Sequence, residues 1–233
     1  MNGWGGTSEM INLADKNNLA DIFEGSADAN ILLMTDDTNG DALFVDDIYT
    51  ALPGTVTEQQ ARITQIDEIR AGAGDDIVDM TSQRFEYVGD GVKIYGGLGD
   101  DTIWANNGNN TLFGDAGDDR LVGGSDADVL VGGSGNDSMH GGGGDDIFCF
   151  GGDWGVDAVE QLDGGSVTLW FEEGSESNWD ASTLTYTDGA NSVTVSGVTE
   201  VTLKFGGEPL VAGAFSDAAS EKIFEDKNKG MLA

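Results

Sequence analysis

The sequence predicts an all-β chain in which short strands stack into a solenoid, and three observations lead to that prediction. Six nine-residue units follow one another without a gap between residues 96 and 149. Glycine is abundant, with 37 residues against 2 prolines, which favours many tight turns with positive φ. The chain also carries 43 acidic and only 10 basic residues, for a formal net charge of −33.

The six units share an apolar eighth position. They read GGLGDDTIW, ANNGNNTLF, GDAGDDRLV, GGSDADVLV, GGSGNDSMH and GGGGDDIFC. The eighth residues are all large and apolar: Ile103, Leu112, Leu121, Leu130, Met139 and Phe148. Because a strand of three residues is too short to stand alone, the units must stack and align these side chains as one inner stripe.

The sixth position of each unit carries an oxygen donor at the end of a glycine-rich bend. These residues are Asp101, Asn110, Asp119, Asp128, Asp137 and Asp146. Stacked bends place the carboxylates above one another, where their repulsion requires a cation. Carboxylates and turn carbonyls suit Ca²⁺ with its roughly six to eight oxygen ligands, whereas Mg²⁺ demands a stricter octahedron. Zinc favours His or Cys, which the ligand positions lack.

The units resemble the GGxGxDxUx nonapeptide of RTX (repeats-in-toxin) proteins. The resemblance implies a right-handed parallel β-roll (a β-solenoid) with two units per coil and several calcium ions between bends two units apart. It pairs the following residues: Asp101 with Asp119, Asn110 with Asp128, Asp119 with Asp137, and Asp128 with Asp146. The metal ligands that it implies beyond the sixth positions above are Asp76, Gly97, Gly99, Gly117, Gly124, Gly133, Gly135, Gly142 and Gly144.

Some units depart from the family pattern. Asn110 is neutral, and Asn106 and Asn107 replace the glycine pair, so that bend is expected to be the weaker calcium site. Asp115 and Asp126 stand at positions where glycine is usual, and we expect both to face water.

Looser copies of the unit precede the six. Residues 71–79, AGAGDDIVD, place Asp76 at the ligand position. Residues 87–95 keep the frame but place Val92 there, so this bend should not bind through its side chain. Fainter copies extend the pattern toward the N-terminus: 25–33 and 36–44. Residues 45–70 break the period, with a loop followed by a strand near 66–69.

After Cys149 the composition becomes aromatic and β-branched. Asp153 or Asp157 is expected to supply one terminal calcium ligand. The remaining segments are expected to form a cap over the open end of the roll, which would otherwise be an exposed sheet edge. Its strands are expected at 167–171, 184–187, 192–195 and 201–205, the middle two joined as a hairpin.

The tail has the features of a helix, with Ser216 as a cap and Gly230 as a stop. By position and amphipathicity it resembles the uncleaved C-terminal signal that type I secretion channels read in RTX proteins. The chain thus divides into four regions: a degenerate N-terminal solenoid or capping region (1–70), the calcium-binding β-roll (71–149), an antiparallel, β-rich C-terminal cap (150–211) and a C-terminal helix (212–233).

Residues with chemical potential are isolated. His140 is the only histidine and Cys149 the only cysteine, so no catalytic residue is expected and the chain is not expected to be an enzyme. Trp154, Trp170 and Trp179 are interpreted as core of the cap, with a platform for a sugar or peptide as the alternative.

The sequence therefore predicts the C-terminal part of a secreted or cell-surface bacterial adhesin or toxin. Its partners would be calcium ions and a type I secretion channel, with a surface peptide or glycan as the partner in an alternative reading. A second alternative is the non-catalytic tail of a secreted protease or lipase. The negative charge disfavours nucleic acid, no apolar run approaches the length of a membrane span, and MNGWGGTSE at the start does not resemble an N-terminal secretion signal.

Overall fold

The computed structural model is built almost wholly of β-strands. It describes the following residues: 9–12, 23–24, 30–34, 38–44, 63–82 and 91–206. One 3-10 turn, Glu176–Asn178, is the only helix among them, and none of these residues forms a helix long and apolar enough to cross a membrane. The helix expected at 212–233 lies outside the described residues.

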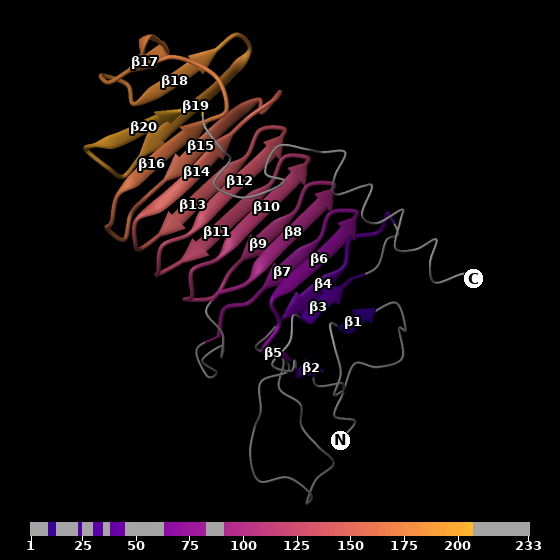
Figure 1. Ribbon diagram of the computed structural model, residues 1–233. Coiled ribbons are helices and arrows are strands. Elements are labelled where there is room, and N and C mark those ends of the chain that lie inside the picture. The colour runs from indigo at the N-terminus through magenta and orange to yellow at the C-terminus, as the bar shows by residue number, and fades with distance from the viewer. Residues whose placement is uncertain are drawn as a thin grey trace, which may run out of the picture.

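Two nine-stranded sheets form the walls of the molecule (Figure 1). The first contains, in spatial order, β1 (Glu9–Asn12), β3 (Asn30–Leu33), β6 (Glu68–Ala73), β8 (Lys93–Leu98), β10 (Thr111–Ala116), β12 (Val129–Ser134), β14 (Asp146–Phe150), β16 (Val167–Phe171) and β20 (Val201–Phe205). The second contains β17 (Trp179–Asp180), β18 (Thr185–Asp188), β19 (Asn191–Ser196), β15 (Val156–Glu160), β13 (Ser138–Gly142), β11 (Arg120–Gly124), β9 (Thr102–Trp104), β7 (Ile77–Asp79) and β4 (Ala42–Phe44). A separate two-stranded sheet pairs β2 (Phe23–Glu24) with β5 (Ile63–Thr64).

From β6 to β16 the chain alternates between the two sheets, and each strand pairs in parallel with the strand two places along the chain. Each pair of nine-residue units therefore makes one coil, which confirms the predicted β-roll. The copies at 25–33 and 36–44 take part, because β3 pairs with β6 and β4 pairs with β7.

The eighth-position side chains form the inner stripe that the repeat predicts. Leu112 lies between Ile94 and Leu130 in the first sheet, and Leu121 lies between Ile103 and Met139 in the second. All six side chains of the stripe are fully buried, as are Leu32, Leu43, Val78 and Ile94 of the looser copies. Burying each such side chain contributes roughly 1.5–3 kcal/mol, so the stripe is the main apolar support of the roll.

The bends between the sheets depend on glycines with left-handed backbone. Gly97 has φ 115° and Gly117 has φ 137°, and an added Cβ at either would collide with a backbone carbonyl of the coil below. The coils therefore approach each other too closely for a side chain at these positions. Asp115 occupies the second position of its unit and has φ 73°, so it adopts a conformation that glycine takes at other bends.

The roll continues past Cys149, which differs from the expected cap. Of the four expected strands, β16 and β20 extend the first sheet in parallel, and β19 pairs in parallel with β15. The connections lengthen here, so the nonapeptide pattern disappears although the strands still stack. The antiparallel cap consists of β17, β18 and β19, with the expected hairpin between the last two.

Stacked aromatic rings close this end of the core. The ring of Phe171 stacks on Tyr186 with 3.9 Å between centroids, and it also stacks on Phe150 and Phe205. Trp154 is buried against the same group at 4.9 Å from Phe150. These aromatic side chains therefore close the apolar core at this end of the roll.

Candidate metal sites

The bends that precede β4, β7, β9, β11, β13 and β15 form one edge of the roll, which we call the first edge. Each bend carries an aspartate, and in every coil but the last its backbone N–H donates to Oδ1 of the aspartate in the next coil. The row comprises Asp41, Asp76, Asp101, Asp119, Asp137 and Asp157. The N···O distances run from 2.6 to 2.9 Å, so the carboxylates are held in a fixed register along the edge.

The bends that precede the strands of the first sheet form the opposite, second edge. There the Asn110 N–H donates to Asp128 Oδ1 at 2.6 Å, and the Asp128 N–H donates to Asp146 Oδ1 at 2.9 Å. Below them, the Val92 N–H donates to Asn110 Oδ1 at 3.0 Å. The structure therefore brings together all four residue pairs that the repeat spacing predicts.

The second oxygen of these carboxylates points into the bend. The Oδ2 atoms of Asp101, Asp119, Asp128, Asp137 and Asp157 are buried and accept no hydrogen bond. A buried charged oxygen without a partner is costly, so each of these atoms requires either a proton or a cation.

A glycine at the first position of a unit leaves space at these oxygens. An added Cβ at Gly114 would collide with Asp119 Oδ2 and lie 2.5 Å from the Gly132 carbonyl oxygen of the next coil. Gly96, Gly123 and Gly132 adjoin the Oδ2 atoms of their own bends in the same way. Carboxylate and carbonyl oxygens thus converge where no side chain fits, and this donor set suits Ca²⁺.

Burial raises the pKa of the stacked aspartates. It raises the pKa of Asp101 and of Asp128 to about 7, and that of Asp137 to about 6. Burial, together with the neighbouring carboxylates, raises the pKa of Asp119 and of Asp157 to about 8. The backbone N–H groups of Asp101 and Asp137, which donate to these two carboxylates, lower the pKa by a smaller amount. The charged rows are therefore unfavourable at neutral pH unless a cation neutralises them.

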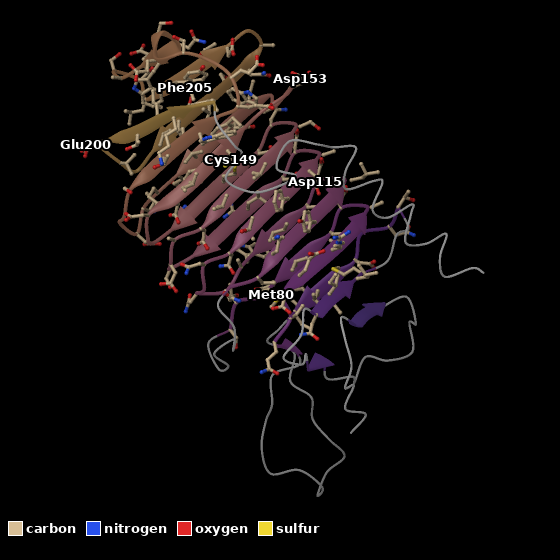
Figure 2. The ribbon with its side chains drawn as sticks, viewed as in Figure 1. Met80, Asp115, Cys149, Asp153, Glu200 and Phe205 are labelled. Atoms are coloured by element: carbon tan, nitrogen blue, oxygen red, sulfur yellow. The ribbon has the colours of Figure 1, made fainter. Side chains whose placement is uncertain are left out.

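The predicted bend glycines all have positive φ, between 98° and 140°: Gly97, Gly99, Gly117, Gly124, Gly133, Gly135, Gly142 and Gly144. Asp76 is buried in the first-edge row, and Asp146 lies in the second-edge row, where burial raises its pKa. Asp157 joins the first edge as expected, whereas Asp153 is exposed beyond the end of β14 (Figure 2).

Two expectations for exposed aspartates have different outcomes. Asp126 is exposed, as predicted. The prediction for Asp115 was wrong, because this residue is half-buried and its charge raises the pKa of both Asp101 and Asp119. Its backbone is left-handed, as at the second-position glycines, and it lies near the end of β10 (Figure 2).

The sequence analysis missed an exposed row of fifth-position side chains on the first edge. The Asp100 N–H donates to Asp75 Oδ1 at 3.0 Å, and the Asp118 N–H donates to Asp100 Oδ1 at 2.8 Å. Asn136 continues the row by donating its N–H to Asp118 Oδ1. The repeated Asp-Asp pairs in the units were the available signal.

The cysteine, the histidine and the tryptophans, which were considered for catalysis or ligand binding, are all partly or fully packed within the fold. Cys149 is 2% exposed and burial raises its pKa to about 12, so the thiol is not activated. His140 is partly buried; its Nδ1 lies 3.9 Å from Glu160 Oε2, and its Nε2 lies 4.0 Å from Asp163 Oδ2. Trp154 is buried in the main core and Trp179 packs against it, which agrees with the core interpretation. Trp170 is buried in a separate cluster with Phe113, Val131 and Cys149.

Within the described ranges, no group of three or more His, Cys, Asp or Glu side chains is arranged as a metal site. In the bend at Asp119, the carboxylate instead meets a backbone carbonyl, that of Gly132, beside the position where Gly114 lacks a side chain.

Comparison with known protein families finds the same repeats. The family model for the RTX calcium-binding nonapeptide repeat, in 4 copies, matches residues 64–79, 93–121 and 122–153. No curated protein matches the sequence. The matched segments contain the bends in which buried carboxylates and glycine carbonyls converge. This part of the chain therefore carries RTX-type calcium-binding repeats.

Proposed function

We propose that the chain is a calcium-dependent folding module at the C-terminal part of a type I-secreted bacterial surface adhesin or toxin. It has no catalytic role of its own. The chain stays unfolded where calcium is scarce, and it folds into the roll outside the cell. Calcium ions and the secretion channel are its partners.

The row of buried carboxylates carries this proposal. Six aspartates in contact through hydrogen bonds, five of them buried, oppose folding at neutral pH unless their charge is neutralised. Bound calcium supplies positive charge and coordination to the converging oxygens. The chain then provides the rest of the site, because its glycine bends hold the carbonyls and its hydrogen bonds orient the carboxylates.

Calcium concentration makes the switch depend on the compartment. Extracellular calcium modules bind in the range of about 0.1–1 mM, far above cytosolic free calcium. At tenfold excess over the dissociation constant, each ion stabilises the folded state by about 1.4 kcal/mol. Several ions together therefore decide whether a marginally stable roll is folded.

No observation favours a peptide- or glycan-binding module as a second candidate. That alternative depended on exposed tryptophans, and Trp154 and Trp170 are 5% and 3% exposed. A role as the non-catalytic tail of a secreted enzyme would use the same calcium-dependent folding, and the coding sequence upstream of this segment would distinguish it from an adhesin or toxin.

Circular dichroism tests the folding switch directly. The calcium-free chain at neutral pH should lack most of its strand signal and should regain it as calcium rises toward the millimolar range. An equally folded calcium-free chain would reject the proposal.

The export role is tested by fusing the full chain to a passive carrier in cells with a type I exporter. Removal of residues 212–233 should keep the carrier inside, while chelation of calcium in the medium should leave the exported chain unfolded. Unchanged export without these residues would reject the export role and leave the calcium switch intact.

A further inference from the structure

The second edge contains a bend in which an amide takes the place of a carboxylate. Asn110 is 2% exposed, and its Nδ2 group faces four oxygens. It lies 2.9 Å from the Asn106 carbonyl, 2.6 Å from the Gly108 carbonyl, 3.1 Å from the Gly123 carbonyl and 3.1 Å from Asp128 Oδ1. An amide has only two hydrogens to donate, so more oxygens converge on this nitrogen than it can satisfy.

The orientation of this amide is determined by its neighbours. Oδ1 accepts the Val92 N–H at 3.0 Å, while every partner of Nδ2 is an oxygen. Exchanging the two atoms would place an oxygen against carbonyl and carboxylate oxygens, and an NH₂ group against an N–H. The nitrogen therefore occupies the centre of the bend.

The oxygens around this nitrogen are those that the other bends offer to a cation. They come from the second and fourth positions of the unit, from the first position of the unit in the next coil, and from that unit's aspartate. In the first-edge bend ending at Asp101, the corresponding groups are the carbonyls of Gly97, Gly99 and Gly114, and the carboxylate of Asp119. There Asp101 Oδ2 is buried without a hydrogen-bond partner, whereas Asn110 has no second carboxylate oxygen to neutralise.

We propose that the Asn110 side chain is a built-in substitute for calcium, so that its bend folds around an amide and binds no ion. The substitution interrupts the second edge. Val92, one coil below Asn110, contributes no ligand side chain. One coil beyond Asp128, the Oδ2 atom of Asp146 accepts the Gln161 Nε2–H at 2.7 Å. The bend between Asp128 and Asp146 is then the one position on this stretch of the second edge that retains a buried, unpartnered carboxylate oxygen. The first edge carries an unbroken row of aspartates over the same coils.

Calcium stoichiometry of the full chain tests this assignment, which rests on the proposed calcium-dependent folding. Bound calcium per folded chain is counted by equilibrium dialysis and by native mass spectrometry at saturating calcium. The Asn110→Asp variant restores the family ligand and should bind one more ion than the wild type. The matched control is Asn109→Asp, which adds the same charge one residue earlier at an exposed position and should leave the count unchanged.

The reciprocal variant keeps the test decisive if Asn110→Asp fails to fold. Asp128→Asn places a second amide in the same kind of bend as Asn110, and it should bind one ion fewer than the wild type. An unchanged count in Asn110→Asp with tighter binding would mean that Asn110 is already a calcium ligand, and this would overturn the inference. So would an unchanged count in Asp128→Asn. A wild-type chain that bound no calcium would instead reject the proposed function.

Discussion

Replacement of Asp119 by alanine tests the first edge most sharply, because this residue joins two neighbouring bends. Its Oδ1 accepts the Asp101 N–H at 2.7 Å, and its own N–H donates to Asp137 Oδ1 at 2.9 Å. Its Oδ2 lies beside Gly114 and the Gly132 carbonyl. We therefore expect Asp119→Ala to weaken the calcium sites on both sides and to leave the buried Asp101 N–H without an acceptor.

The expected magnitude follows from these contacts. An unsatisfied buried N–H costs about 1–3 kcal/mol. A tenfold loss of calcium affinity costs about 1.4 kcal/mol at each of the two sites. The sum is roughly 4–6 kcal/mol, which lowers the melting temperature of the calcium-loaded chain by roughly 10–20 °C. The calcium concentration at the folding midpoint should rise accordingly.

Thermal unfolding and calcium titration, both followed by circular dichroism, measure these shifts. Asp126→Ala is the matched control, because Asp126 is an exposed aspartate in a bend of the same roll and its loss should change stability by less than about 0.5 kcal/mol. Asp115 would be a poor control, since it is half-buried and its charge acts on the Asp119 carboxylate. Equal shifts for Asp119→Ala and Asp126→Ala would refute the assignment of the sixth position as the ligand.

Three further predictions address other parts of the roll. The folded-state pKa values of Asp101, Asp119 and Asp128 are raised to about 7 or 8, so the calcium-free roll is most stable below pH ~4 and loses stability as pH rises through 6–8. Circular dichroism of metal-free protein should therefore show strand signal at pH ~4 and lose it by pH ~8. A flat profile would contradict the burial argument. Gly114→Ala should abolish tight calcium binding in a titration, since the new Cβ collides with Asp119 Oδ2, while Gly143→Ala, with no heavy atom nearer than 3.1 Å, should have a milder effect. Leu121→Ala should lower the free energy of unfolding of the calcium-loaded chain by about 2–5 kcal/mol in a denaturant titration, and a loss below ~1 kcal/mol would argue against a continuous inner stripe.

The period of nine made most of the roll predictable from sequence. Apolar side chains such as Leu112 and Leu121 recur in register, so stacking alone places them inside and places the sixth positions at the edges. The continuation through β16 and β20 was not predictable, because longer connections remove the repeat while the strand geometry persists. Asp115 was misjudged because its position was assumed to tolerate an outward side chain, whereas the residue is half-buried and its charge acts on Asp101 and Asp119.

The sequence predicted only part of the role proposed for Asn110. Its neutral side chain indicated a weaker site, but sequence does not show which amide atom faces the bend. The atom is determined by the Val92 N–H below, which takes Oδ1 and turns Nδ2 toward the carbonyls. Gln161 gave no signal at all, since it follows the repeats and reaches Asp146 only because the roll continues beyond them.

The hydrogen bonds between successive aspartates make neighbouring bends depend on one another. When a cation orders the Asp119 carboxylate, Oδ1 of the same group holds the Asp101 N–H of the previous coil, and the Asp119 N–H holds the Asp137 carboxylate of the next. Ordering one bend therefore reduces the conformational entropy that the adjacent bend must lose, which favours cooperative calcium binding along the first edge. At Asn110 the backbone N–H donates to Asp128 Oδ1 in the same way, while the side-chain amide requires no ion. The second edge can thus order that bend at any calcium concentration at which the first edge folds, and among the bends from Val92 to Asp146 only the one between Asp128 and Asp146 adds a calcium requirement of its own.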